Sequence, residues 1–177
     1  MFKKILEVKM KYIKYIFLLL TIVTFQSCGI YGFTQPSSIK AETFQVNRFE
    51  NNSLLVEPGL ERDFQNALQD LILDQTNYSL VTSNADLVYE GEITTYRVSP
   101  TTATSDNKAA QNRLTIGVKI SFYNKNNEED NEEGKSFSFF YDYPGSAQLV
   151  GSQKATAHEE IFERLTQDII NATLAKW

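Results

Sequence analysis

The sequence of 177 residues has few of the residue types that build most catalytic and metal centres. It contains one cysteine and one histidine. A single cysteine excludes an intrachain disulfide and a cysteine-based zinc site, and a single histidine argues against a histidine metal cluster. Beyond the N-terminal segment, no hydrophobic run is long enough to cross a membrane, which excludes a polytopic membrane protein. The formal net charge of −5 argues against a nucleic-acid partner. We therefore expect no catalytic residues, no cofactor and no metal.

Residues 1–27 predict a signal peptide. Residues 1–14 carry five lysines and one glutamate, and residues 15–25 are mainly apolar. A basic segment followed by a short apolar segment is typical of secretory signal peptides, and the apolar run is shorter than the ~20 residues of a transmembrane helix. Translation could begin at Met1 or at Met10, and the sequence leaves both starts open.

Cys28 follows the apolar segment directly, within Phe25-Gln26-Ser27-Cys28-Gly29. A small residue before a lone cysteine at this place resembles a bacterial lipobox, although Phe25 and Gln26 stand where that motif prefers leucine. We expect Cys28 to be lipidated, because an unpaired exposed thiol is a liability in an oxidising compartment. Several acyl chains at about 0.8 kcal/mol per buried CH2 would then give stable anchoring. The alternative is an ordinary cleavage site with a cysteine beside it. No acidic residue lies directly after Cys28 to signal retention in the inner membrane, and no acidic cluster suggests surface export, so we expect the periplasmic face of the outer membrane.

Cleavage before Cys28 leaves an anionic protein. The removed segment carries five lysines and one glutamate, so the net charge changes from −5 to −9. Residues 28–38 are rich in glycine, proline and serine and predict a flexible tether. We expect residues 39–177 to form a single domain.

Hydrophobic periodicity in the rest of the chain predicts an α+β fold with the order β-α-β-β-β-α. Alternation predicts strands over 39–50, 87–98, 114–122 and 137–143, with a shorter strand signal at 78–82. Apolar residues at helical spacing predict a helix from Pro58, and Thr156–Glu159 resembles a capping box opening a second helix. We expect two helices on one face of a four-stranded, mostly antiparallel (mixed) sheet, with the first helix connecting a parallel pair.

Two local features qualify this pattern. Phe49 breaks the alternation of the first strand, which suggests a bulge, and Gly91 lies inside a strand, which suggests a bulge or a close backbone approach. The segment 99–111 is polar and aperiodic, and we expect it to be a long connection.

Four stretches taken in order resemble a known family. They are Cys28-Gly-Ile-Tyr-Gly-Phe, Leu55-Val-Glu-Pro-Gly-Leu60, Ala85-Asp-Leu-Val-Tyr-Glu-Gly-Glu-Ile93 and Asn112-Arg-Leu-Thr-Ile116. Together with the order of the elements, they make residues 28–177 similar to the LptE family of lipopolysaccharide-assembly lipoproteins.

The resemblance implies a non-enzymatic role. Members of that family plug and help assemble an outer-membrane β-barrel, LptD, which inserts lipopolysaccharide into the outer leaflet. Cys28 matches a functional position of the family. The segment 99–111 and its basic residues Arg97, Lys108 and Arg113 are candidates for contact with the barrel or with lipopolysaccharide phosphates. The alternative for these three residues is a solvated surface.

Other polar groups fit structural roles better than catalysis. His158 lacks a nucleophile and an orienting partner in the sequence, and we expect it to be a surface polar residue. Glu90 and Glu92 share one strand face, which a solvated surface explains. The acidic run 128–133 lacks the spacing of a calcium loop and predicts a solvated hairpin tip.

Two other classes of protein stay open at this point. One is a lipoprotein activator or accessory subunit of another periplasmic enzyme or secretion pore, which can share this order of elements. The other is a small-ligand binding module, which would need a concave apolar pocket.

Overall fold

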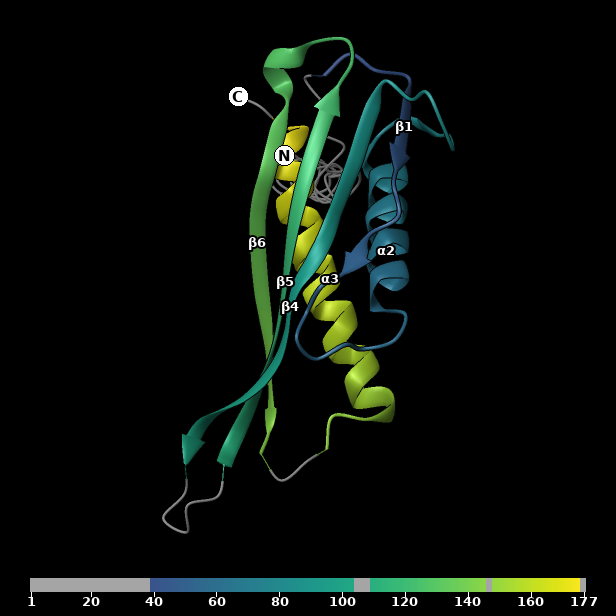
Figure 1. Ribbon diagram of the computed structural model, residues 1–177. Coiled ribbons are helices and arrows are strands. Elements are labelled where there is room, and N and C mark those ends of the chain that lie inside the picture. The colour runs from purple at the N-terminus through teal and green to yellow at the C-terminus, as the bar shows by residue number, and fades with distance from the viewer. Residues whose placement is uncertain (1–38, 104–108, 146–147, 176–177) are drawn as a thin grey trace, which may run out of the picture. The chain divides into compact units, whose positions relative to one another are not determined.

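A mixed sheet and two α-helices form the fold of this computed structural model, which describes residues 39–103, 109–145 and 148–175 (Figure 1). The predicted signal peptide, the tether with Cys28, and Lys108 lie outside the described residues. In chain order the elements are β1 (Thr43–Val46), β2 (Glu50–Asn51), α2 (Leu60–Gln75), β3 (Ser79–Leu80), β4 (Leu87–Ala103), β5 (Ala109–Asn124), a 3-10 turn (Glu128–Asp130), β6 (Glu132–Pro144) and α3 (Gly151–Thr173).

The sheet confirms the predicted α+β class and its parallel connection. Its strand order is β3-β1-β4-β5-β6, with β2 also paired to β4. The strands β1, β2 and β3 make parallel pairs, whereas β4, β5 and β6 form an antiparallel meander. The described residues form six strands rather than the four predicted for the sheet. Strand β3 lies within the shorter strand signal at 78–82, and β2 is a separate two-residue strand at the end of the first predicted strand.

The predicted long connection over 99–111 was also wrong in its extent. Strand β4 continues to Ala103 and β5 begins at Ala109, so most of this segment is a hairpin extension. Strands pair through backbone hydrogen bonds and need no apolar face. A polar segment can therefore form a strand without showing the alternating apolar residues on which the prediction depended. The pairing here is irregular, with register shifts around Thr102.

Both helices cover one face of the sheet (Figure 1). Alternate residues of β5 are completely buried on that face: Leu114, Ile116, Val118, Ile120 and Phe122. The Phe64 ring of α2 packs edge-on against Phe49, at a centroid distance of 5.2 Å, and against Phe162 of α3 at 5.4 Å. Burying each such ring stabilises the fold by roughly 1.5–3 kcal/mol.

Helix α3 begins earlier than the sequence predicts. Its first residue is Gly151 and its N-cap is Val150, so Thr156 lies inside the helix and the predicted capping box was wrong. Ala157, Ile161, Leu165 and Ile169 form one buried row of α3, and Phe162, Thr166 and Ile170 form a second buried row. Phe162, Thr166 and Ile170 are buried because α3 packs against α2 as well as against the sheet.

The structure supports both expectations about local irregularity. Val46 pairs with Tyr89 and Glu50 pairs with Glu92, so the stretch between β1 and β2 holds one more residue than the facing stretch of β4. Gly91 lies against Ile120 of β5, and a Cβ atom there would overlap the Lys119 carbonyl oxygen. Among the described residues, no helix has the length and apolar character needed to span a membrane.

Candidate functional site

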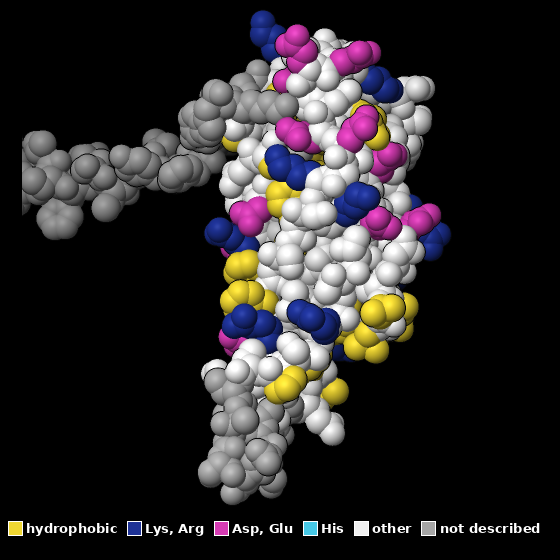
Figure 2. Space-filling view, turned by 60° about the vertical axis from the view of Figure 1, so that its left-hand side comes forward, with side chains coloured by type: hydrophobic (Ala, Val, Ile, Leu, Met, Phe, Trp, Pro, Cys, Tyr) yellow, Lys and Arg dark blue, Asp and Glu magenta, His cyan; other side chains and the backbone are white. Residues whose placement is uncertain are grey.

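The outer face of the sheet, opposite the helices, carries the two described residues predicted for contact with a barrel or lipopolysaccharide. Directly opposed residues of antiparallel strands share a face, and Arg97 opposes Thr115 while Ser99 opposes Arg113. Arg97 and Arg113 are therefore diagonal neighbours on this face. Toward the lower end of Figure 2, Lys and Arg side chains lie beside hydrophobic side chains.

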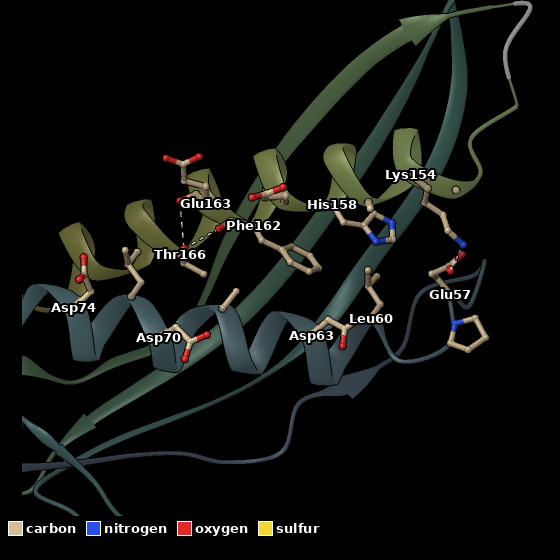
Figure 3. A pocket seen from close by; sticks show the side chains of 16 residues that line it. Glu57, Leu60, Asp63, Asp70, Asp74, Lys154, His158, Phe162, Glu163 and Thr166 are labelled. Carbon is tan, nitrogen blue, oxygen red and sulfur yellow. Dashed lines mark hydrogen bonds and ion pairs between the residues drawn. The ribbon is translucent and has the colours of Figure 1, made fainter.

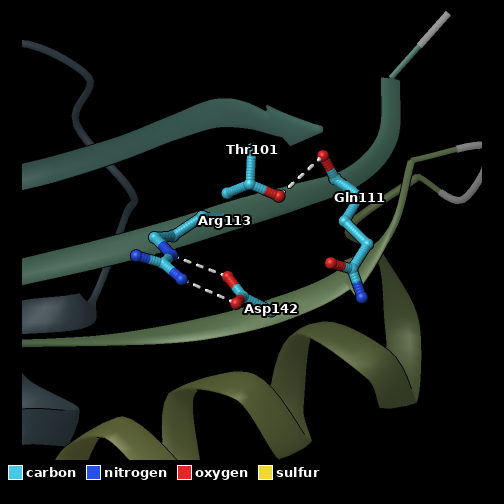
Figure 4. A network of polar contacts seen from close by, with 4 residues as sticks. All are labelled: Thr101, Gln111, Arg113 and Asp142. Atoms are coloured by element: carbon cyan, nitrogen blue, oxygen red, sulfur yellow. Dashed lines mark hydrogen bonds and ion pairs between the residues drawn. The ribbon is translucent and has the colours of Figure 1, made fainter. Parts of the chain in front are cut away.

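Arg113 is fixed by two partners on β6. Its Nε and Nη2 atoms donate hydrogen bonds to the two carboxylate oxygens of Asp142, each at 2.7 Å (Figure 4). Its guanidinium carbon lies 3.5 Å from the centre of the Phe140 ring. A guanidinium has five N–H donors, so three N–H groups stay available for another acceptor. The hydrogen bonds from Arg113 lower the pKa of the Asp142 carboxyl group.

Arg97 differs from Arg113 because it is exposed and makes no ion pair with a described residue. The structure thus brings two of the three predicted basic residues onto one face, and Lys108 lies outside the described part of the chain. Toward the end of the hairpin, the Thr101 hydroxyl donates to the Gln111 carbonyl oxygen at 3.2 Å (Figure 4). This end of the sheet offers hydrogen-bond donors beside the exposed side chains of Val98 and Phe140, and the donors suit an anionic or polar partner.

The carboxylates considered for acid–base chemistry hold strands together instead. Glu90 accepts a hydrogen bond from the Asn47 amide at 3.3 Å, and Glu92 accepts one from the Asn52 amide. In the acidic hairpin, Asp130 accepts hydrogen bonds from the Asn124 and Asn127 amides. The described residues contain no group of three or more side chains that could hold a metal ion.

His158 is half-buried, so the prediction of a surface position was only partly right. Its Nε2 atom lies 3.1 Å from the Tyr96 hydroxyl, and its ring stacks on Phe162 at 5.8 Å. Burial lowers the pKa of His158 below its ordinary value, which favours the neutral imidazole. Burial also raises the pKa of Tyr96 to about 12. The hydrogen bond and the ring stacking join β4 to α3 at this point.

A groove between α2 and α3 is the feature that the sequence did not reveal. It has a volume of about 860 Å3 and runs along the two helices, which lie side by side (Figure 3). Its floor includes Leu60, Ala67, Leu71 and Phe162, and six acidic residues line it. Leu71 lies in the apolar row that predicts the first helix, whereas Phe162 lies in the second buried row of α3. Only the packing of the two helices decides that a hollow lies between them.

Comparison with solved structures defines the class of fold. The hypothetical protein CT253 from Chlamydia trachomatis matches with a TM-score of 0.54 and 8% identity, over 77% of this chain and 100% of that chain. An uncharacterised lipoprotein B from Nitrosomonas europaea matches with a TM-score of 0.50 and 10% identity, over 81% and 84% of the two chains. At these identities the likeness shows the fold alone. No curated protein sequence matches the chain significantly.

The chain thus has an α+β fold in which two helices lie on a mixed sheet, with a polar hairpin at one end and no metal-binding group among its described residues. Residues 41–173 match the family model described as LptE, lipopolysaccharide-assembly. Because the match covers most of the sequence, the chain belongs to this family, as the four stretches predict.

Proposed function

We propose that this protein is a non-enzymatic lipoprotein, anchored through Cys28 at the periplasmic face of the outer membrane, which plugs and helps assemble the LptD barrel. The observation that carries the proposal is the family match over residues 41–173. We further propose that the complex of this protein with the barrel transports lipopolysaccharide. In this proposal the lipid is contacted near the β4–β5 hairpin.

The shape and chemistry of the hairpin support a plug. Strands β4 and β5 continue past the helices at one end of the domain (Figure 1). Arg97, Thr101 and Arg113 give this end polar side chains on the outer face of the sheet. The lumen of an outer-membrane barrel is polar, so such a hairpin can enter it without burying unpaired polar groups in an apolar medium.

Co-purification tests the proposal. The tagged protein is extracted from outer membranes in mild detergent, and the associated proteins and lipopolysaccharide are quantified by mass spectrometry. We expect one large barrel near stoichiometry together with lipopolysaccharide. The double variant Arg97→Gln/Lys108→Gln should lose about half or more of the lipopolysaccharide, because each charge–phosphate contact of this kind contributes about 0.2–1 kcal/mol.

The matched control is Lys119→Gln/Lys125→Gln, which removes two exposed basic charges away from the hairpin end. We expect this control to retain both barrel and lipopolysaccharide. Equal losses in the two double variants would reject a contact at the hairpin. Recovery of a periplasmic enzyme or another pore without a barrel would reject the plug and favour an accessory subunit of that complex.

A further inference from the structure

The groove between α2 and α3 has an apolar floor and an acidic rim. On α2, the lining residues Asp63, Ala67, Asp70, Leu71 and Asp74 follow one helical stripe. On α3, Glu159, Phe162, Glu163 and Thr166 do the same (Figure 3). The stripe from Asp63 to Asp74 covers eleven helical steps, or roughly 16 Å at 1.5 Å per residue.

The acidic charge of this groove is largely uncompensated by the described residues. Lys154 is the one lysine or arginine among the described lining residues, and its Nζ atom lies 2.6 Å from Glu57 Oε1. Asp63 pairs with Arg62 at 3.2 Å. No described basic side chain forms an ion pair with the other four lining carboxylates: Asp70, Asp74, Glu159 and Glu163. The net negative potential is therefore concentrated along the groove beyond Lys154.

We propose that this groove binds a basic amphipathic segment of a protein partner. Lysine and arginine have long apolar stems and charged ends, so their stems can lie on Leu71 and Phe162 while their charges reach the carboxylates on the rim. Apolar residues of the same segment would fill the floor. The groove is long enough for about three turns of a helix or about five extended residues.

Other occupants match the groove less well. A phosphate or anionic lipid head group would meet four carboxylates without basic partners, so electrostatic repulsion opposes it. A single divalent cation needs several oxygen ligands converging on one point. The described residues contain no group of three potential metal ligands, because the carboxylates are spread along two helices. A peptide segment with several basic side chains can instead meet the carboxylates one after another along the groove.

Peptide binding to the detergent-solubilised full-length protein tests the proposal. The probe is a fluorescent twelve-residue peptide of lysine and leucine with its leucines on one helical face. We expect saturable binding by fluorescence anisotropy, weakened by salt because the rim charges are exposed. The variant Asp70→Asn/Glu163→Gln should weaken binding about fivefold or more, since two exposed charge contacts are lost.

The matched control variant is Glu61→Gln/Glu160→Gln, which removes the same charge from the same two helices outside the groove lining. It should bind the peptide as the unchanged protein does. A second peptide with serine in place of leucine should bind at least fivefold more weakly, because the floor is apolar. Thermal melting of both variants checks that each is folded.

Three results would overturn the proposal. Equal weakening in the two double variants would show general attraction to an acidic surface. Equal binding of the serine peptide would show that the floor takes no part. Absence of saturable binding up to millimolar peptide, or saturation of the groove by Mg2+ alone, would exclude a peptide site. The probe contains neither lipopolysaccharide nor a barrel, so these results are independent of the proposed plug.

Discussion

At the scale of single residues, close contacts around Gly91 limit which side chains the sheet can accept at that position. Gly91 lies in β4 where the backbone of β5 and the ring of Phe49 both approach it. The Phe49 Cε1 atom and the Ile120 Cα atom would each lie 3.0 Å from an added Cβ. The sequence predicts this approach from a glycine inside a strand pattern, but the identity of the approaching atoms comes from the fold.

Replacing Gly91 by alanine should therefore destabilise the protein. The added methyl group meets the Lys119 carbonyl oxygen, which belongs to the backbone and cannot rotate away. We expect a loss of about 1–3 kcal/mol in the free energy of unfolding, measured by urea denaturation. Ser99→Ala in the same strand is the control and should change stability by less than about 0.5 kcal/mol. Equal stability of Gly91→Ala and the unchanged protein would contradict the described packing.

At the scale of elements, the short parallel strand β1 depends on one carboxylate. Asp86, just before β4, accepts hydrogen bonds from the Glu42 and Thr43 backbone N–H groups at 2.9 and 3.0 Å. The Thr43 hydroxyl also donates to it at 3.0 Å. These bonds, first the one from Glu42, lower the pKa of Asp86. The ionised carboxylate thus holds the start of β1 against the sheet.

Asp86→Asn should destabilise the protein at neutral pH and much less in acid. The folded state lowers the pKa of Asp86, so its contribution is present above the unfolded pKa of about 3.9 and is lost as the pH falls through the lower, folded value. At pH 7 we expect a cost of about 1.5–3 kcal/mol from weakened charge-assisted hydrogen bonds.

Urea denaturation at pH 7 and at pH 3 measures this difference. Asp74→Asn, an exposed aspartate on α2 without a described ion-pair partner, is the control and should have little effect at either pH. A cost for Asp86→Asn that does not shrink between pH 7 and pH 3 would show that the carboxylate charge is not the cause.

At the scale of the whole molecule, the two faces have different chemistry. The helix layer carries the acidic groove, whereas the outer sheet face carries Arg97 and Arg113 close to the hairpin. Partners of opposite charge can therefore use separate surfaces of one small domain. Cys28 lies outside the described residues. If it is lipidated as proposed, the acidic groove and the outer sheet face both lie at the periplasmic face of the outer membrane.

Cys28→Ser should abolish lipid attachment. Fatty-acid labelling of cells that express the tagged protein measures incorporation, and membrane fractionation measures location. We expect label in the unchanged protein and none in Cys28→Ser, which should leave the membrane fraction because several acyl chains supply the anchoring energy. Ser27→Ala keeps a small residue before the cysteine and should retain the label. Label in Cys28→Ser would exclude Cys28 as the modified residue.

The sequence by itself determined the α+β class, the parallel connection through α2 and the alternating pattern of β5, which follow from local periodicity. It also indicated the family, through the four stretches that resemble it. It did not determine that β2 is a separate two-residue strand or that β4 and β5 extend into the segment 99–111, since backbone pairing leaves no apolar pattern.

Only the tertiary structure decided which side chains meet. The Arg113–Asp142 pair, the Tyr96–His158 contact and the groove between α2 and α3 each join segments at least 29 positions apart. Such contacts depend on how helices and strands pack, and that packing is set by the whole core rather than by the spacing of residues along one element.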